Sequence, residues 1–231
     1  ASCLVGSEMC IRDRSSIKQH QTPNWFKKAK FGIYAHWGIY SVPAAGPNVT
    51  WYPYWMYRPP SPQFDYHCKH YGHPSKFGYK DFIPMFTAEK FNADEWADLY
   101  YRSGAKFAGP VAEHHDGFPM WNCSDTEWCA SKMGPKRDIV GELAKAIRNK
   151  GMKYMVAMHH AENWFFFPHW NNDFDTSKKE YESLYGELHN LDLIGNQAVY
   201  PDHWGRKNEH QDKPSKAFHD RWLNRLKEVV D

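Results

Sequence analysis

The chain carries little net charge and no long hydrophobic run. Among its 231 residues, 29 Lys and Arg nearly balance 27 Asp and Glu, which leaves a formal charge of +2 at pH 7. Because the two signs are spread along the chain, we expect neither a nucleic acid nor a membrane surface as a partner. No stretch of about 18 apolar residues occurs, so no bilayer-spanning helix is predicted.

The chain also has few cysteines, and its first residues do not resemble a signal peptide. Residues 1–14 have no apolar segment long enough for a signal peptide, and we interpret them as a non-native leader of the kind that begins many reading frames in assembled environmental sequence. Beyond this leader only Cys68, Cys123 and Cys129 remain. Three cysteines make no disulfide framework, and a pairing of Cys123 with Cys129 stays open.

Aromatic residues are what the chain has in excess. Hydrophobic residues make up 42% of the sequence and aromatic residues 17%, enough for one domain with a sizeable core. Many aromatics stand beside Pro and Gly in residues 41–84, a segment that we expect to be a packed loop over a site because it looks too irregular for a regular element. Exposed rings next to polar groups are typical of sugar-binding proteins.

Strand and helix patterns alternate along the rest of the chain. Short apolar runs predict strands, and helix caps with apolar stripes predict the helices that follow them. The strands are expected at 31–35, 105–112 and 153–158, and the helices after Asn92, after Asp138, from Ser177 and from Ser215. This order predicts an α/β fold with a parallel sheet, and specifically an incomplete (β/α)₈ TIM-like barrel with its first three βα units, since a whole barrel needs about 250 residues.

Polar side chains crowd the ends of the three predicted strands. These residues are His36 after the first strand, Glu113 to Asp116 after the second, and His159, His160 and Glu162 after the third. Because the carboxyl ends of parallel strands meet at one face, we expect the five histidines to converge there. A neutral imidazole offers one donor and one acceptor, which suits the neighbouring hydroxyls of a sugar.

Three other chemistries are less well supported. A metal centre is the rival interpretation of the histidines, but adjacent strand residues point to opposite faces, and neither His-x-His nor His-Glu-x-x-His occurs. Nucleophilic catalysis lacks a Gly-x-Ser-x-Gly elbow and a positioned cysteine. Residues 134–143 resemble a phosphate loop only superficially, and we interpret them as a turn and helix cap in which Arg137 holds a carboxylate or loop carbonyls.

Taken together, several stretches resemble the catalytic domain of the family 29 glycoside hydrolases, the retaining α-L-fucosidases. The resemblance runs in order over about residues 25–170 and fades toward Asp231. Its most specific pieces are Phe31-Gly32-Ile33-Tyr34-Ala35-His36-Trp37-Gly38, Trp51-Tyr52, Phe91-Asn92-Ala93-Asp94-Glu95-Trp96, His114-His115-Asp116-Gly117-Phe118 and Gly134-Pro135-Lys136-Arg137-Asp138.

The resemblance implies a barrel that binds L-fucose and needs no cofactor or metal. His36, His114 and His115 would contact the sugar hydroxyls, and Trp51 would line the site. The nucleophilic Asp and the acid/base carboxylate of the family would lie beyond Asp231, so residues 15–231 are expected to be the N-terminal part of the catalytic domain, inactive alone. Two departures from the family pattern are Thr50, where Glu is common, and Glu113, where Lys is common.

The leading hypothesis is therefore an α-L-fucosidase acting on fucosylated oligosaccharides or glycoconjugates. A fucose-binding, lectin-like module without catalysis is the alternative, and a metal-dependent barrel hydrolase is a third. An incomplete barrel leaves strand edges open, so we expect the isolated chain to associate into homo-oligomers. The sequence itself leaves the location unknown, whereas the family implies the periplasm, the lysosome or the outside of the cell.

Overall fold

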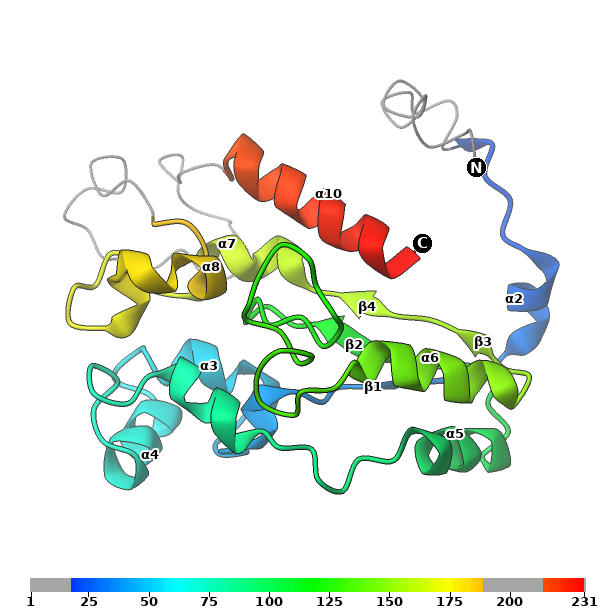
Figure 1. Ribbon diagram of the computed structural model, residues 1–231, viewed down its shortest axis with the longest axis horizontal. Coiled ribbons are helices and arrows are strands. Elements are labelled where there is room, and N and C mark those ends of the chain that lie inside the picture. Colours follow the sequence, from blue (N-terminus) through cyan, green and yellow to red (C-terminus); the bar gives the residue numbers. More distant parts are fainter. Residues whose placement is uncertain (1–17, 189–213, 231) are drawn as a thin grey trace.

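A parallel sheet forms the centre of the molecule, whose computed structural model describes residues 18–188 and 214–230 (Figure 1). The central strand is β2 (Phe107–Glu113), which pairs in parallel with β1 (Gly32–Ala35) on one side. On its other side it pairs in parallel with β3 (Lys153–Tyr154) and β4 (Ala157–Met158). The predicted α/β class with a parallel sheet is thereby confirmed.

The third predicted strand is divided into β3 and β4, and a proline on the neighbouring strand accounts for the break. The Met155 N–H donates to the carbonyl of Ala108 at 3.0 Å. In a parallel ladder the Met155 carbonyl would then accept from residue 110, but Pro110 has no N–H. The Met155 carbonyl can approach the backbone here only because Gly109 has no side chain. A Cβ built at Gly109 would lie 1.6 Å from the Met155 oxygen.

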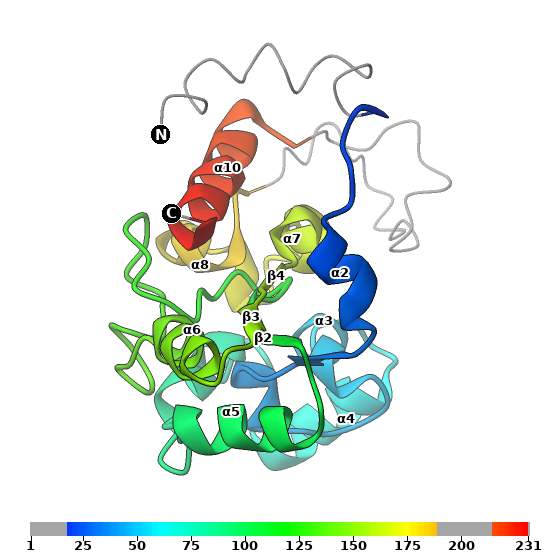
Figure 2. The same cartoon turned by 90° about the vertical axis from the view of Figure 1, so that its right-hand side faces the viewer.

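Two amphipathic helices cover one side of the sheet. The helix α5 (Ala93–Arg102) begins where the Asn92 side chain accepts from the backbone N–H groups of Asp94 and Glu95. The helix α6 (Ile139–Asn149) begins where the Asp138 side chain accepts from the Gly141 N–H. The apolar stripe of α6 is buried as predicted. Figure 2 shows α5 below the strands, α6 beside them and α10 (Lys216–Val230) above them.

The aromatic segment after β1 is more regular than expected. It contains the nine-residue helix α4 (Pro62–His70), which begins where Ser61 accepts from the backbone N–H of Phe64 at 3.0 Å and Pro62 occupies the first turn. The prediction of an irregular loop was wrong here because this start signal was overlooked. The other elements of the segment are α3 (Tyr52–Trp55) and the 3₁₀ turns η1 (Ile39–Ser41), η2 (Val49–Trp51) and η3 (Tyr79–Met85).

The predicted long helix from Ser177 was also wrong. That region forms the 3₁₀ turns η5 (Asp175–Ser177) and η6 (Lys179–Tyr181) and the short helix α8 (Glu182–Tyr185). The buried Asp175 accepts hydrogen bonds from the hydroxyls of Tyr57 and Tyr185, both at 2.7 Å, and so ties this region to Tyr57, which lies 118 positions away in the sequence. The elements η4 (His160–Glu162) and α7 (Asn163–Phe166) precede this region, and α2 (Asn24–Ala29) precedes the sheet.

The ends of the strands set the position of the candidate site. Figure 1 shows α3, α7 and α8 gathered near the carboxyl ends of the strands, at the left of the view, whereas α2 stands at their amino ends. In the two described ranges, no helix has the length and apolar character needed to cross a bilayer. The expected leader, residues 1–14, lies outside the described part of the chain.

Candidate functional site

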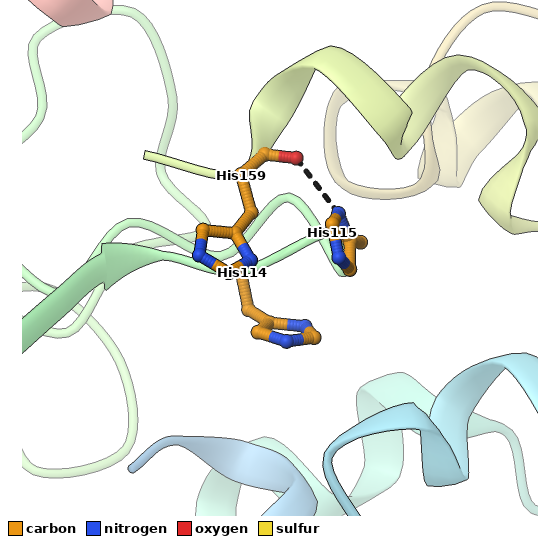
Figure 3. A group of neighbouring side chains, drawn as sticks. All are labelled: His114, His115 and His159. Carbon is orange, nitrogen blue, oxygen red and sulfur yellow. Dashed lines mark hydrogen bonds between the residues drawn. The ribbon is translucent and has the colours of Figure 1, made fainter. Parts of the chain in front are cut away.

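Four of the five strand-end histidines meet at the carboxyl edge of the sheet. The ring centroids of His114 and His115 are 4.4 Å apart, and those of His115 and His159 are 4.8 Å apart. The His36 ring lies 5.6 Å from that of His114 and 5.4 Å from that of His159. Figure 3 shows the rings of His114, His115 and His159 as neighbours. We refer to His36, His114, His115 and His159 as the histidine cluster.

A turn after β2 places both members of the His114 and His115 pair in this cluster. The strand ends at Glu113, so the alternation of side chains along a strand does not apply to the two residues that follow. Our expectation that they diverge was therefore wrong. Gly117 completes the turn at φ +77°, where a Cβ would lie 2.7 Å from the Leu184 carbonyl, and Asn163 Nδ2 donates to the His115 carbonyl at 2.8 Å.

Hydrogen bonding fixes the tautomer of His115. Its Nδ1 lies 2.9 Å from the His159 carbonyl oxygen, which can only accept, so Nδ1 carries the proton and Nε2 keeps a lone pair. That Nε2 lies 3.8 Å from a carboxylate oxygen of Glu162, whose side chain is 46% exposed. The cluster therefore contains an imidazole with a defined acceptor nitrogen.

Burial keeps the imidazoles of the cluster neutral near pH 7. Burial lowers the pKa of His36, and it lowers the pKa of His115 and His159 to about 4. The pKa of His114 falls well below its ordinary value, first through burial and then through the neighbouring imidazoles. Each ring thus presents one donor and one acceptor rather than a positive charge.

Aromatic rings form one wall of the cluster. The Trp51 centroid lies 5.0 Å from that of His115 and 5.4 Å from that of Phe166, and Phe166 lies 5.5 Å from His115. The Tyr34 hydroxyl contacts His36 Nε2 and lies 3.4 Å from His159 Nε2. Sequence reasoning placed Trp51 here but missed Tyr34 and Phe166, although Tyr34 stands only two residues before His36.

The fifth histidine, His160, does not join the cluster, which corrects our expectation of convergence. Its ring is buried, stacks on Phe218 of α10 and donates from Nδ1 to Glu113 Oε1 at 2.5 Å. The same carboxylate oxygen accepts from Arg225 Nη1 at 2.6 Å, and both side chains of this ion pair are 0% exposed. Glu113 therefore serves the packing of α10 rather than the face where the cluster lies.

The structure also tests the expectations for Arg137, for the cysteines and for the aromatic residues 51–57. Arg137 binds a carboxylate and a loop carbonyl as expected: its Nε donates to Glu142 Oε1 at 2.9 Å and its Nη1 to the Phe91 carbonyl at 3.0 Å. Cys123 and Cys129 are free, so the pairing left open does not form; Cys123 Sγ instead lies 2.9 Å from Asp125 Oδ1. The tyrosines of residues 51–57 are buried, which confirms that most of these aromatics serve packing.

Comparison with known proteins gives consistent matches. The sequence model of the family described as Alpha-L-fucosidase matches residues 7–231. The tissue alpha-L-fucosidase of Rattus norvegicus is 40% identical over 154 residues, which are 66% of this chain and 32% of that protein. The plasma alpha-L-fucosidase of Homo sapiens is 45% identical over 136 residues, 58% of this chain and 28% of that protein. The chain thus spans about a third of the length of these curated relatives.

Solved structures agree with the sequence matches. The crystal structure of Thermotoga maritima alpha-fucosidase is 33% identical, with a TM-score of 0.69 over 95% of this chain and 46% of that chain. The structure of that enzyme in complex with fucose has a TM-score of 0.68 at the same identity and coverage. A family 29 alpha-L-fucosidase from Bacteroides thetaiotaomicron, 21% identical with a TM-score of 0.54, shares the fold.

Proposed function

Because this chain belongs to the alpha-L-fucosidase family, we propose that the protein is a retaining glycoside hydrolase that releases α-L-fucose from fucosylated oligosaccharides or glycoconjugates. In this proposal, the described strands are the first part of a (β/α)₈ barrel. The observation that carries it is the meeting of neutral imidazoles at the carboxyl ends of β1, β2 and β4. The Thermotoga maritima alpha-fucosidase, 33% identical to this chain, has been solved in complex with fucose.

The chemistry of the cluster matches that of a deoxyhexose. His36, His114 and His115 bind the ring hydroxyls, because each neutral imidazole both donates and accepts a hydrogen bond. His115 accepts at Nε2, since its Nδ1 proton is committed to the His159 carbonyl. Trp51 offers an apolar face to the C–H groups of the sugar, as aromatic rings do in carbohydrate sites.

The cleavage step requires two carboxyl groups about 5 to 5.5 Å apart, one as nucleophile and one as acid/base. We assign neither role to a residue of this chain. Two buried carboxyls adjoin the cluster in sequence, Glu113 and Asp116. Glu113 pairs with Arg225 at 2.6 Å. Asp116 accepts from the Tyr79 hydroxyl at 2.7 Å and from the Phe118 N–H at 3.1 Å, and these hydrogen bonds hold the turn after β2. We therefore expect the 231-residue chain to bind fucose without hydrolysing fucosides.

Calorimetric titration of the chain with L-fucose tests this function. His115→Ala should weaken fucose binding about three- to tenfold, the value of a lost neutral hydrogen bond. His70→Ala is the matched control, since His70 lies exposed on α4, away from the cluster, and should leave the affinity unchanged. D-glucose should bind more weakly than L-fucose. Equal fucose affinity of His115→Ala and the unaltered chain would contradict the assignment.

A further inference from the structure

Three imidazoles of the histidine cluster also form a possible set of metal ligands, and two of them are proposed sugar contacts. Each of His114, His115 and His159 offers one ring nitrogen such that the three atoms lie within 4.8 Å of one another. Figure 3 shows that they come from two neighbouring strand ends, after β2 and after β4. Three imidazoles with an open fourth position are a known arrangement for zinc in proteins.

We propose that His114, His115 and His159 bind one divalent transition-metal ion of the zinc and copper class, and that this ion excludes the sugar from the cluster. The exclusion rests on the proposed function, whereas the binding of the ion does not. Imidazole nitrogen favours zinc, copper and nickel, while magnesium and calcium require oxygen ligands. The ligand set therefore selects the class of ion.

The tautomer of His115 supports the proposal. Metal-binding histidines commonly donate the proton of their second ring nitrogen to a carbonyl or carboxylate, which orients the ring. His115 has this arrangement, because its Nδ1 donates to the His159 carbonyl at 2.9 Å and its Nε2 lone pair remains for a ligand. His114 is 3% exposed, and its Nδ1 has no hydrogen-bond partner among the described residues. Both rings thus have a nitrogen that can accept an ion.

The required movement is small. Zinc–nitrogen bonds of about 2.0 to 2.1 Å place tetrahedral ligands roughly 3.3 Å apart. The three nitrogens, which lie within 4.8 Å of one another, close by at most about 1.5 Å. Rotation about the last torsion of an imidazole side chain has broad minima and supplies shifts of this size. Glu162, 3.8 Å from His115 Nε2, lies close enough to approach as a fourth ligand.

The ion and the sugar use the same lone pairs. A histidine nitrogen that coordinates an ion cannot accept a hydrogen bond from a sugar hydroxyl at the same time. In the proposed function His114 and His115 contact fucose, so the metal-bound chain loses two of its three sugar-binding imidazoles. The ion should therefore act as a competitor of the sugar.

The test is calorimetric titration of the untagged 231-residue chain with zinc chloride in a non-chelating buffer. We expect one ion per chain, and His159→Ala should weaken its binding at least about tenfold. His70→Ala serves again as the matched control and should leave zinc affinity unchanged, since His70 is an exposed residue of α4. Zinc affinity that is the same for the unaltered chain and for folded His159→Ala would overturn the proposal.

A second measurement needs no variant. Cobalt(II) replaces zinc in tetrahedral nitrogen sites and then absorbs strongly in the visible range, whereas hydrated octahedral cobalt absorbs weakly. Intense absorption at one equivalent supports the site, and the spectrum of hydrated cobalt alone refutes it even if His159→Ala fails to fold.

Competition is measured by repeating the zinc titration in saturating L-fucose. A raised apparent dissociation constant for zinc supports exclusion, and an unchanged constant in a chain that does bind fucose overturns it. If fucose fails to bind at all while zinc binds through His159, the proposed function fails and the metal site stands. The two ideas are thus tested separately.

Discussion

Replacing Arg225 by methionine should destabilise the protein strongly. Its guanidinium is 0% exposed and donates to Glu113 Oε1 at 2.6 Å and to the Gly117 carbonyl at 3.2 Å, while Nη2 lies 3.1 Å from Asp125. Burial alone would raise the pKa of Glu113, but Arg225 and the His160 hydrogen bond hold this pKa below its ordinary value, so the carboxylate is charged. Arg225→Met leaves that charge buried with one partner fewer.

The expected loss is about 3 to 5 kcal/mol of unfolding free energy, the typical cost of removing one member of a buried ion pair. For a chain of this size, that corresponds to a decrease in Tm of roughly 6 to 20 °C. Urea unfolding followed by circular dichroism gives the free energy, and a thermal scan gives Tm.

Arg102→Met is the matched control, because Arg102 pairs with Asp98 on the exposed face of α5 with 68% and 40% of the two side chains exposed. Such exposed pairs contribute about 0 to 1 kcal/mol. The double variant Glu113→Leu with Arg225→Met should lose less unfolding free energy than the two single variants together. In the double variant neither charge is left buried without its partner. An Arg225→Met variant as stable as Arg102→Met would refute this reasoning.

Two further changes test the same region. Burial favours a higher pKa for Asp125, but Arg225 outweighs it and brings the pKa to about 2, compared with 3.8 ordinarily. Asp125 therefore stabilises the fold fully above pH 3.8, and this contribution disappears as the pH falls through 2. The difference in unfolding free energy between the unaltered chain and Asp125→Asn should shrink between pH 5 and pH 2, and a constant difference would contradict the assignment. Gly117→Ala should cost about 1 to 3 kcal/mol in urea unfolding, because of its φ of +77° and the Leu184 carbonyl 2.7 Å from the new Cβ. Gly72→Ala, also at positive φ but with nothing within 4 Å of its Cβ, should cost less, and equal costs would show that crowding at Gly117 is unimportant.

The strand ends could be predicted because their signals are local. An apolar run followed by histidines marks the end of a strand, and parallel pairing then brings such ends to one edge of the sheet. The division of the third strand could not be read in the same way. It depends on the Met155 carbonyl facing Pro110, which has no N–H to donate, and that register is set only when the strands pair.

The role of α10 was also beyond local reasoning. The apolar spacing of the sequence predicts a buried stripe on this helix, and Phe218 of that stripe is buried. The stripe consists of Phe218, Trp222, Leu226 and Val229. Arg225, however, is less exposed than any of these, at 0%. A buried arginine is explained only by its partner, and Glu113 lies 112 positions away in the sequence. Helical periodicity cannot report such a distant charge.

The neighbours Glu113 and His114 show how the same burial can leave one group charged and another neutral. Both are almost fully buried, at 0% and 3% exposed. Glu113 remains a carboxylate because Arg225 faces it, whereas the groups around His114 are other imidazoles, which lower its pKa further. The negative charge of Glu113 is thus compensated by Arg225 of α10. The histidine cluster offers hydrogen-bond donors and acceptors but carries no charge. An anionic sugar would gain a positively charged partner only if a buried imidazole took up a proton. Burial opposes that protonation. An uncharged sugar needs only the hydrogen bonds that the neutral rings already offer, so the proposed binding of fucose predicts weaker binding of a uronate or a sugar phosphate.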